Sequence, residues 1–162
     1  MKVVPVVIDP YDPATSLLIP LVTQRIIRFA EEHVPEVSPR ETARVFMSRL
    51  MVADPNIKVC AFVADGGKCV GHAIATIECL DSLTTLAHIW QVHVDPSVNS
   101  EDAVPRALDL LIEWAREYSE KVLLPQGRPP ISKVKMETSR DDRAYIRKYG
   151  FEKLRHIMIR SI

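Results

Sequence analysis

The sequence has no excess of charge of either sign, and this excludes some classes of partner. Its 162 residues carry 21 Lys plus Arg against 21 Asp plus Glu, for a formal net charge of zero. A general nucleic-acid binder or a protein held on an anionic membrane needs a surplus of positive charge. We therefore expect no nucleic acid and no membrane among its partners.

Long apolar runs and cysteines are also scarce. The first residues, MKVVPVVIDPYDP, have neither the apolar length of a signal peptide nor that of a membrane span. Cys60, Cys69 and Cys79 are odd in number and lack the paired spacing of a zinc site. We expect them to be buried, reduced thiols, which predicts a cytoplasmic protein without a bound metal.

Several catalytic motifs are absent as well. The sequence holds no Gly-x-Ser-x-Gly elbow, no glycine loop ending in Lys-Ser/Thr and no His-x-x-x-His pair. Apolar residues make up 47% and charged residues 26%, as in ordinary globular proteins. The length suits one domain with a real core, and we assign residues 1–162 to it.

The first third of the sequence predicts one strand and two helices. Residues 2–8 read as a strand, and Pro5 indicates either an edge strand or an irregular start. Residues 16–33 have apolar side chains at helical spacing, with Pro20 in the first turn. The second helix, 38–54, begins with Ser38 as N-cap, Pro39 at the first helical position and Glu41 three residues after the cap. Its expected buried face is Val45, Phe46, Leu50 and Met51.

The rest of the sequence changes to strand periodicity. The segment 58–80 reads as two strands joined by the hairpin signal Asp-Gly-Gly-Lys at 65–68. The elements expected after it are a strand at 85–95, a helix at 103–119, a proline-rich connection at 120–132, a strand at 133–138, a short helix at 140–150 closed by Gly150, and a final strand at 153–162. This order predicts an α/β (α+β) fold with a mixed sheet of about six strands and four helices. An antiparallel meander should lead into a parallel strand–helix–strand unit.

Three segments carry a resemblance to a known family. AFVADGGKCVGHAIATI resembles a hairpin with Gly71 early in its second strand, VHVDPSVNSEDAVPRALDLLIEWA resembles a strand-to-helix cofactor motif, and METSRDDRAYIRKYGFEKL resembles a closing segment ending in Gly-Phe. In this order they are similar to the GNAT superfamily of acyl-CoA-dependent N-acyltransferases. The resemblance covers 58–162, while 1–57 fits the family's variable front end by element order.

The resemblance implies a binding site for acetyl-CoA or another acyl-CoA between two splayed parallel strands, here 86–94 and 133–138. Backbone groups of the first strand would pair with the pantetheine arm and the acyl carbonyl. N–H groups of the turn and helix start would hold the pyrophosphate. The residues matched to cofactor binding are Val92, His93, Val94, Asn99, Ser100, Ala103, Val104 and Arg106.

The matched turn lacks the family's glycines and carries Glu101 and Asp102 instead. Carboxylates there gain roughly 0.3–1 kcal/mol each from the helix dipole. They would repel a diphosphate by about 1–4 kcal/mol per charge pair. These magnitudes favour an acidic turn that caps its own helix, with Asp102 as N-cap and Pro105 at the third position, over a diphosphate site.

The candidate base is His93. The family often places a carboxylate on this strand, but residues 89–93 hold none, and imidazole titrates near neutrality. The alternative is a histidine bonded within a half-buried sheet. The fallback bases are His72, Glu78 and Asp81. Strand alternation places His88, Trp90 and Val92 on one face, and Ile89, Gln91 and His93 on the other. Trp90 itself suits the core or the wall of an acceptor pocket.

The candidate acid is Tyr145. The resemblance implies a tyrosine four residues before the glycine, to protonate the leaving thiolate, but Ile146 stands there. Tyr145 lies about 100° away around a helix. Tyr149 reads as a packing residue beside Phe151.

The sequence therefore supports one main hypothesis and two alternatives. The first is an N-acyltransferase that moves an acetyl or acyl group to a small-molecule or protein amine. The others are a catalytically inactive GNAT-fold module that binds a ligand or protein, and a subunit of a larger assembly. The apolar final strand could also pair in a homodimer.

Overall fold

The computed structural model describes residues 2–98, 102–136 and 143–153 of the chain. The elements in order are β1 (Val3–Val7), α1 (Pro13–Ser16), α2 (Ile19–His33), α3 (Pro39–Met51), β2 (Ile57–Ala64), β3 (Cys69–Cys79), β4 (Thr85–Val94), α4 (Ala103–Tyr118), β5 (Val134–Met136) and α5 (Arg143–Tyr149).

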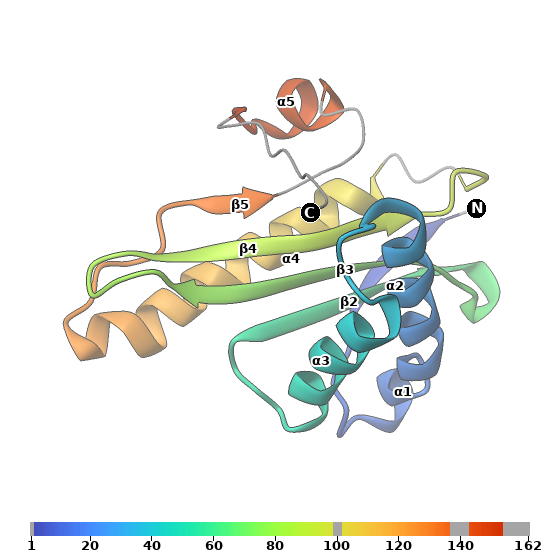
Figure 1. Ribbon diagram of the computed structural model, residues 1–162, viewed down its shortest axis with the longest axis horizontal. Coiled ribbons are helices and arrows are strands. Elements are labelled where there is room, and N and C mark those ends of the chain that lie inside the picture. The colour runs from blue at the N-terminus through green and yellow to red at the C-terminus, as the bar shows by residue number, and fades with distance from the viewer. Residues whose placement is uncertain (1, 99–101, 137–142, 154–162) are drawn as a thin grey trace.

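The strands form one mixed sheet in the order β1-β2-β3-β4-β5 (Figure 1). The first four run antiparallel to their neighbours, and β5 runs parallel to β4. This confirms the predicted meander and parallel unit, and it confirms Pro5 on an edge strand. The described residues give five strands rather than about six, since the expected final strand lies outside them from residue 154 onward.

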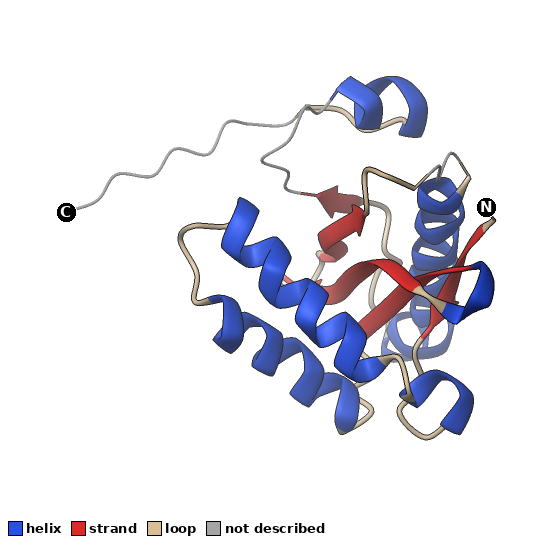
Figure 2. Ribbon diagram, turned by 90° about the vertical axis from the view of Figure 1, so that its right-hand side faces the viewer, coloured by secondary structure: helices blue, strands red, loops and turns tan. Residues whose placement is uncertain are grey.

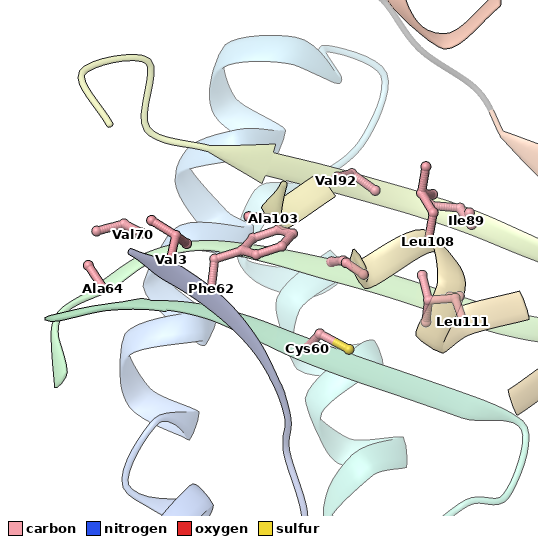
Figure 3. Packing of buried hydrophobic residues seen from close by; sticks show 13 residues of the cluster. Val3, Cys60, Phe62, Ala64, Val70, Ile89, Val92, Ala103, Leu108 and Leu111 are labelled. Atoms are coloured by element: carbon pink, nitrogen blue, oxygen red, sulfur yellow. The ribbon is translucent and has the colours of Figure 1, made fainter. Parts of the chain in front are cut away.

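Helices cover both faces of the sheet (Figure 2). One face packs against α2 and α3 through a core cluster that includes Ile26, Phe46 and Ile74. The other packs against α4 through a cluster that includes Phe62, Leu108 and Leu111 (Figure 3). The amphipathic patterns of the helices and the apolar strands account for this layering, because each helix buries one stripe against the sheet.

The first expected helix is split in two. Asp12 caps the one-turn α1, where its Oδ1 accepts the N–H of Ala14 at 2.9 Å. A second helix then begins at Ile19 and not at residue 16 as predicted. Proline is tolerated only in a first turn, so Pro20 requires the new helix to start just before it.

The helix α3 begins as predicted, with Ser38 in extended conformation and Pro39 after it, but its details differ. Ser38 makes no side-chain capping hydrogen bond, and Glu41 binds Arg44 instead of closing a capping box. Two residues of the expected buried face are exposed, Val45 at 44% and Met51 at 51%. The buried face is Ala43, Phe46, Met47 and Leu50, which keeps helical spacing toward the sheet.

The connection after α4 is partly helical and not the loop we expected. A π-helical turn spans Ser119–Leu123, and a 3₁₀ turn spans Leu124–Gln126. The buried hydroxyl of Ser119 donates to the carbonyl of Ala115 and accepts the N–H of Ile131, each at 2.9 Å. This serine ties the connection back to the helix.

The expectation of three buried thiols holds for two of them. Cys60 and Cys69 are buried, and burial raises the pKa of Cys60 to about 12. Cys79, at the end of β3, is exposed. Among the described residues, none of the helices has the length and apolar character needed to cross a membrane.

Candidate functional site

The site lies along the end of β4, beyond its described pairing with β5. The pairing of β4 with β5 joins Ala87 to Val134, His88 to Lys135 and Ile89 to Met136. Within the described residues the pairing ends there, while β4 continues five residues further to Val94. Among the described residues, the side of β4 that faces away from β3 carries no printed pairing beyond Ile89, and this side of residues 90–94 is called the open edge.

A β-bulge lies at the same point. The register with β3 passes from Ala75–Ile89 to Ile74–Gln91, so Trp90 is an extra residue on β4. The bulge reverses the alternation, and the prediction that Val92 shares a face with His88 and Trp90 is wrong. Val92 packs with Ile89 in the core cluster beneath α4.

The bulge also decides which backbone groups face the open edge. The N–H of Asp95 donates to the carbonyl of Val70 on β3 at 2.9 Å, so residue 95 points toward β3. In an antiparallel pair the direction alternates, and the N–H and C=O of Val92 and Val94 then point away from β3. These are two of the residues that sequence matched to the pantetheine arm.

Gly71 lets β3 and β4 approach closely beside this edge. A Cβ built at Gly71 would lie 2.2 Å from the carbonyl oxygen of His93 and 2.9 Å from Cα of Val94. No side chain fits at those distances, so only glycine permits this packing.

The N-terminus of α4 follows the turn, as expected. Ala103 and Val104 open the helix and pack in the same cluster as Val92 and Val94. Asp102 occupies the N-cap position, but its carboxylate makes no capping hydrogen bond. The predicted N-cap position of Asp102 and the third helical position of Pro105 are confirmed, but the side chain of Asp102 leaves the first N–H groups of the helix uncapped.

Of the remaining residues matched to cofactor binding, the structure describes Arg106 but not the three residues before Asp102. Arg106 is exposed in the first turn of α4, where its N–H donates to the carbonyl of Asp102 at 3.2 Å. Asn99, Ser100 and Glu101 lie outside the described residues. Their expected contacts with a pyrophosphate stay a prediction.

The side chain of His93 points to the opposite face of the sheet, toward α2. Its ring lies 5.7 Å from that of Phe29, 6.2 Å from that of His33 and 6.3 Å from that of His72, measured between centroids. His93 is half-buried. Its role as a base stays a prediction.

His72 is a buried partner of this group. It donates Nε2–H to Oε1 of Gln91 at 2.7 Å, and its Nδ1 has no partner among the described residues. Burial lowers the pKa of His72 to about 4, with a further lowering from His93 and Arg25. A neutral, fully buried imidazole suits a structural role better than the fallback base we considered.

An ion pair that the sequence did not suggest ties α2 to the end of β4. Arg25 donates to both carboxylate oxygens of Asp95 at 3.0 Å, and Nη2 also donates to the carbonyl of Cys69 at 2.7 Å. The hydrogen bonds from Arg25 lower the pKa of Asp95. Asp95 immediately precedes the cofactor turn, so this pair fixes the turn relative to α2.

A second polar cluster occupies the α3 side of the same strands. Nδ1 of His88 donates to Oε1 of Glu78 at 3.0 Å, and the indole N–H of Trp90 donates to Oγ1 of Thr76 at 2.8 Å. The rings of His88 and Trp90 have centroids 3.9 Å apart. Sequence analysis named Glu78 as a fallback base but gave no sign that it would pair with His88.

The third fallback base, Asp81, lies away from both clusters. Its Oδ1 accepts the N–H of Leu83 at 2.8 Å in the exposed turn between β3 and β4. Its backbone carbonyl accepts Nη2 of Arg128 at 2.9 Å. These contacts give Asp81 a role in the turn.

The structure confirms part of what the sequence predicted for the closing segment. Gly150 follows α5 with φ +72°, the left-handed conformation expected of a residue that ends a helix. Tyr149 and Phe151 pack against the α4-side core, as we expected of Tyr149. Tyr145 falls within α5, but its side chain lies outside the described part, so its role stays a prediction.

Two further observations on the described residues concern a possible metal site and a hollow elsewhere on the surface. No group of three or more His, Cys, Asp or Glu residues there could hold a metal ion. A hollow of about 460 Å³ lies beside the C-terminal half of α4, lined among others by Trp114, Tyr118 and Lys58. It is remote from the open edge of β4, which is next to the start of that helix.

Comparison with known proteins identifies the fold. No family sequence model and no curated protein matches the chain. Among solved structures, glucosamine-6-phosphate N-acetyltransferase from Arabidopsis thaliana matches with a TM-score of 0.64 at 14% identity, covering 99% of each chain. The aminoglycoside 6'-N-acetyltransferase AAC(6')-Ih from Acinetobacter baumannii matches with a TM-score of 0.64 at 11% identity, covering 99% of this chain and 98% of that one.

A third structure contains a CoA-type ligand. AAC(6')-Iy in complex with the bisubstrate analog CoA-S-monomethyl-acetylneamine matches with a TM-score of 0.62 at 15% identity, covering 100% of this chain and 99% of that one. These likenesses and the mixed sheet define the class: the chain has the GNAT fold. At these identities they show the fold and no substrate.

Proposed function

We propose that the protein is an N-acyltransferase that moves an acetyl or other acyl group from acyl-CoA to an amine. One observation carries this proposal. The bulge at Trp90 leaves the backbone groups of Val92 and Val94 pointing away from β3, on an edge that has no strand partner among the described residues, next to the start of α4. Such an edge can pair with the amide-containing pantetheine arm as an added strand would.

The described residues fit an acyl-CoA in this place. The N–H groups of Ala103 and Val104 are not capped by Asp102, and a helix N-terminus attracts a diphosphate. Arg106 is exposed in the same turn, where its guanidinium could pair with a phosphate. Asn99 and Ser100 would complete the set. Glu101 and Asp102 oppose it unless their carboxylates point to solvent.

The reaction would rest mainly on positioning. A bound acyl-CoA supplies the thioester carbonyl that the amine attacks, and one C–N bond forms as the C–S bond breaks. The ring of His93 takes the proton that the amine loses, and Tyr145 donates a proton to the departing thiolate. Backbone groups at Val92 and Val94 orient the carbonyl.

A thermal-shift titration tests the proposal directly. A ligand at about 100 times its Kd should stabilise the native protein by roughly 2.7 kcal/mol. We expect this with acetyl-CoA or a longer acyl-CoA, and a weaker effect with adenosine alone. The absence of a shift with every CoA species would overturn the proposal and leave a GNAT-fold module without this activity.

Substitution of His93 tests its role. His93→Ala should lower turnover about 100-fold, the lower range for loss of a general base, while leaving CoA affinity within twofold. His33→Ala, which removes a neighbouring imidazole on α2, is the matched control and should keep turnover. Equal turnover of His93→Ala and the parent chain would remove His93 from the mechanism.

The acidic turn is tested by neutralising it. Glu101→Gln together with Asp102→Asn should tighten CoA binding if the carboxylates face the phosphates. An unchanged affinity would show that they point to solvent. Because CoA affinity is measured without turnover, either result reports on binding at the turn and not on catalysis.

A further inference from the structure

A second polar cluster on the α3 side of β3 and β4 has features that the proposed transfer does not use. It consists of Thr76, Glu78, His88 and Trp90. His88 is only 2% exposed, and its Nδ1–H donates to Glu78 at 3.0 Å. The other ring nitrogen, Nε2, is buried with no partner among the described residues. A buried nitrogen without a hydrogen-bond partner lowers the stability of the folded state, so its presence here needs an explanation.

The contact between His88 and Glu78 fixes the carboxylate. One oxygen of Glu78 accepts the imidazole N–H, while the side chain as a whole stays 29% exposed. A carboxylate can accept further hydrogen bonds at its remaining lone pairs. Glu78 therefore presents a positioned negative charge at the surface of this face.

Trp90 provides an aromatic wall beside that charge. Its ring is 40% exposed, although its N–H is held by Thr76 at 2.8 Å and one face stacks on His88. Phe46 of α3 lies 5.9 Å away, between ring centroids. A tryptophan fixed on two sides and open on another is pre-organised to contact a ligand.

The position of this wall relates it to the proposed chemistry. Trp90 is the bulge residue, and it directly follows Ile89, the last residue of β4 that pairs with β5 among the described residues. Backbone groups of Val92, two residues further on, face the opening proposed for the acyl group. A molecule lying over Trp90 on the α3 side is thus next to that opening but across the sheet from α4.

We propose that Glu78 and Trp90 form the acceptor pocket, that it binds a primary alkylamine as its ammonium ion, and that His88 positions Glu78. The bound ammonium ion loses one proton to solvent to become the neutral amine that attacks the thioester, and His93 takes the second proton as the C–N bond forms. This inference rests on the proposed transferase function. An ammonium group gains from a carboxylate and from the face of an indole together, whereas a neutral or aromatic amine gains little from the charge.

The fluorescence of Trp90 provides a direct test. The chain has two tryptophans, so Trp114→Phe leaves Trp90 as the single indole. The probe is butylamine at pH 7, compared with butanol for size and with sodium chloride at the same ionic strength. We expect a saturable fluorescence change in the millimolar range with butylamine and none with butanol or salt.

Variants separate recognition from folding. Glu78→Gln should weaken butylamine binding about tenfold, which corresponds to the loss of roughly 1.4 kcal/mol from a charged hydrogen bond. Glu117→Gln, on the exposed side of α4, is the matched control and should not change it. His88→Gln should weaken binding while Glu78 is still present, and circular dichroism checks that each variant is folded.

The outcomes distinguish this inference from the proposed function. Equal responses to butylamine and butanol, or a Glu78→Gln chain that binds butylamine as the parent does, would overturn the acceptor pocket even if acyl-CoA binds. An acyl-CoA thermal shift that is absent while the Glu78-dependent amine response is present would overturn the transferase and keep a cationic amine site. In steady-state assays with butylamine as acceptor, Glu78→Gln should raise KM for the amine and leave CoA affinity unchanged.

Discussion

Gly71 is the residue whose substitution tests the geometry of the site most directly. It pairs with Phe62 on β2 and with Val94 on β4. In Gly71→Ala the new Cβ would meet the carbonyl oxygen of His93 at 2.2 Å and Cα of Val94 at 2.9 Å. Both atoms belong to the backbone, so no side-chain rotation relieves the contact, and β3 and β4 have to separate.

The expected cost is large for a single methyl group. Overpacking of a well-packed core costs about 1–3 kcal/mol, and contacts with fixed backbone put this case at about 3 kcal/mol or more. For a protein of this size, 3 kcal/mol corresponds to a fall in Tm of roughly 6–12 °C. Urea unfolding at pH 7 gives the free energy, and thermal unfolding gives the Tm.

Gly67→Ala is the matched control. Gly67 has φ +80° and no atom within 4 Å of a built Cβ, so alanine there meets only backbone strain of about 1–2 kcal/mol. It lies in the β2–β3 turn, away from the open edge, and should leave any acyl-CoA thermal shift unchanged. Gly71→Ala should reduce that shift, because it displaces the backbone of β4 at Val94.

Two results would contradict the close packing of β3 and β4 at Gly71. A Gly71→Ala chain within about 1 kcal/mol of the parent would show that the two strands are not packed this closely. A normal acyl-CoA shift in a strongly destabilised Gly71→Ala chain would show that the edge near Val94 does not contribute to binding.

Three further predictions concern the rest of the molecule. Arg25→Gln and Asp95→Asn, made singly and combined, should show a coupling free energy of about 1–2 kcal/mol in urea unfolding at pH 7, and no coupling there would refute the pair. Because Arg25 lowers the pKa of Asp95, the stability that the pair contributes should be lost as pH falls below about 4. Burial lowers the pKa of His72 to about 4, below the usual 6.5, so the unfolded chain binds a proton that the native chain excludes. Stability should therefore fall by up to roughly 3 kcal/mol between pH 6.5 and 4, and His72→Gln should flatten that slope in chemical unfolding. Ellman's reagent should label one thiol of the native chain, Cys79, and three after unfolding; native labelling that persists in Cys79→Ser would contradict the burial of Cys60.

The sequence predicted the element order and the parallel pair because these depend on local signals. Apolar periodicity, Pro5, Pro39 and the Asp-Gly-Gly-Lys turn each act within a few residues, and the structure confirms what they indicated. The late start of α2 at Ile19, just before Pro20, was also a local effect, although the pattern of apolar residues hid it.

The sequence could not predict which residues of β4 share a face of the sheet. Alternation predicts one face for His88, Trp90 and Val92, but the bulge at Trp90 moves Val92 to the other face. A bulge arises where the registers of two strand segments disagree, and that disagreement depends on β3 as much as on β4. The same displacement decides which backbone groups face the opening.

Candidate residues could be named from the sequence, but their partners could not. His93, Val92 and Ala103 follow from the motif, and the structure places Val92 and Ala103 in one cluster and His93 across the sheet. The pairs Arg25–Asp95 and Glu78–His88 join residues 70 and 10 positions apart. Sequence alone thus determined the order of elements and the kind of fold, because these follow from short-range backbone preferences. Only the tertiary structure decided which side chains share a face and a charge, because contacts between distant residues depend on register and packing.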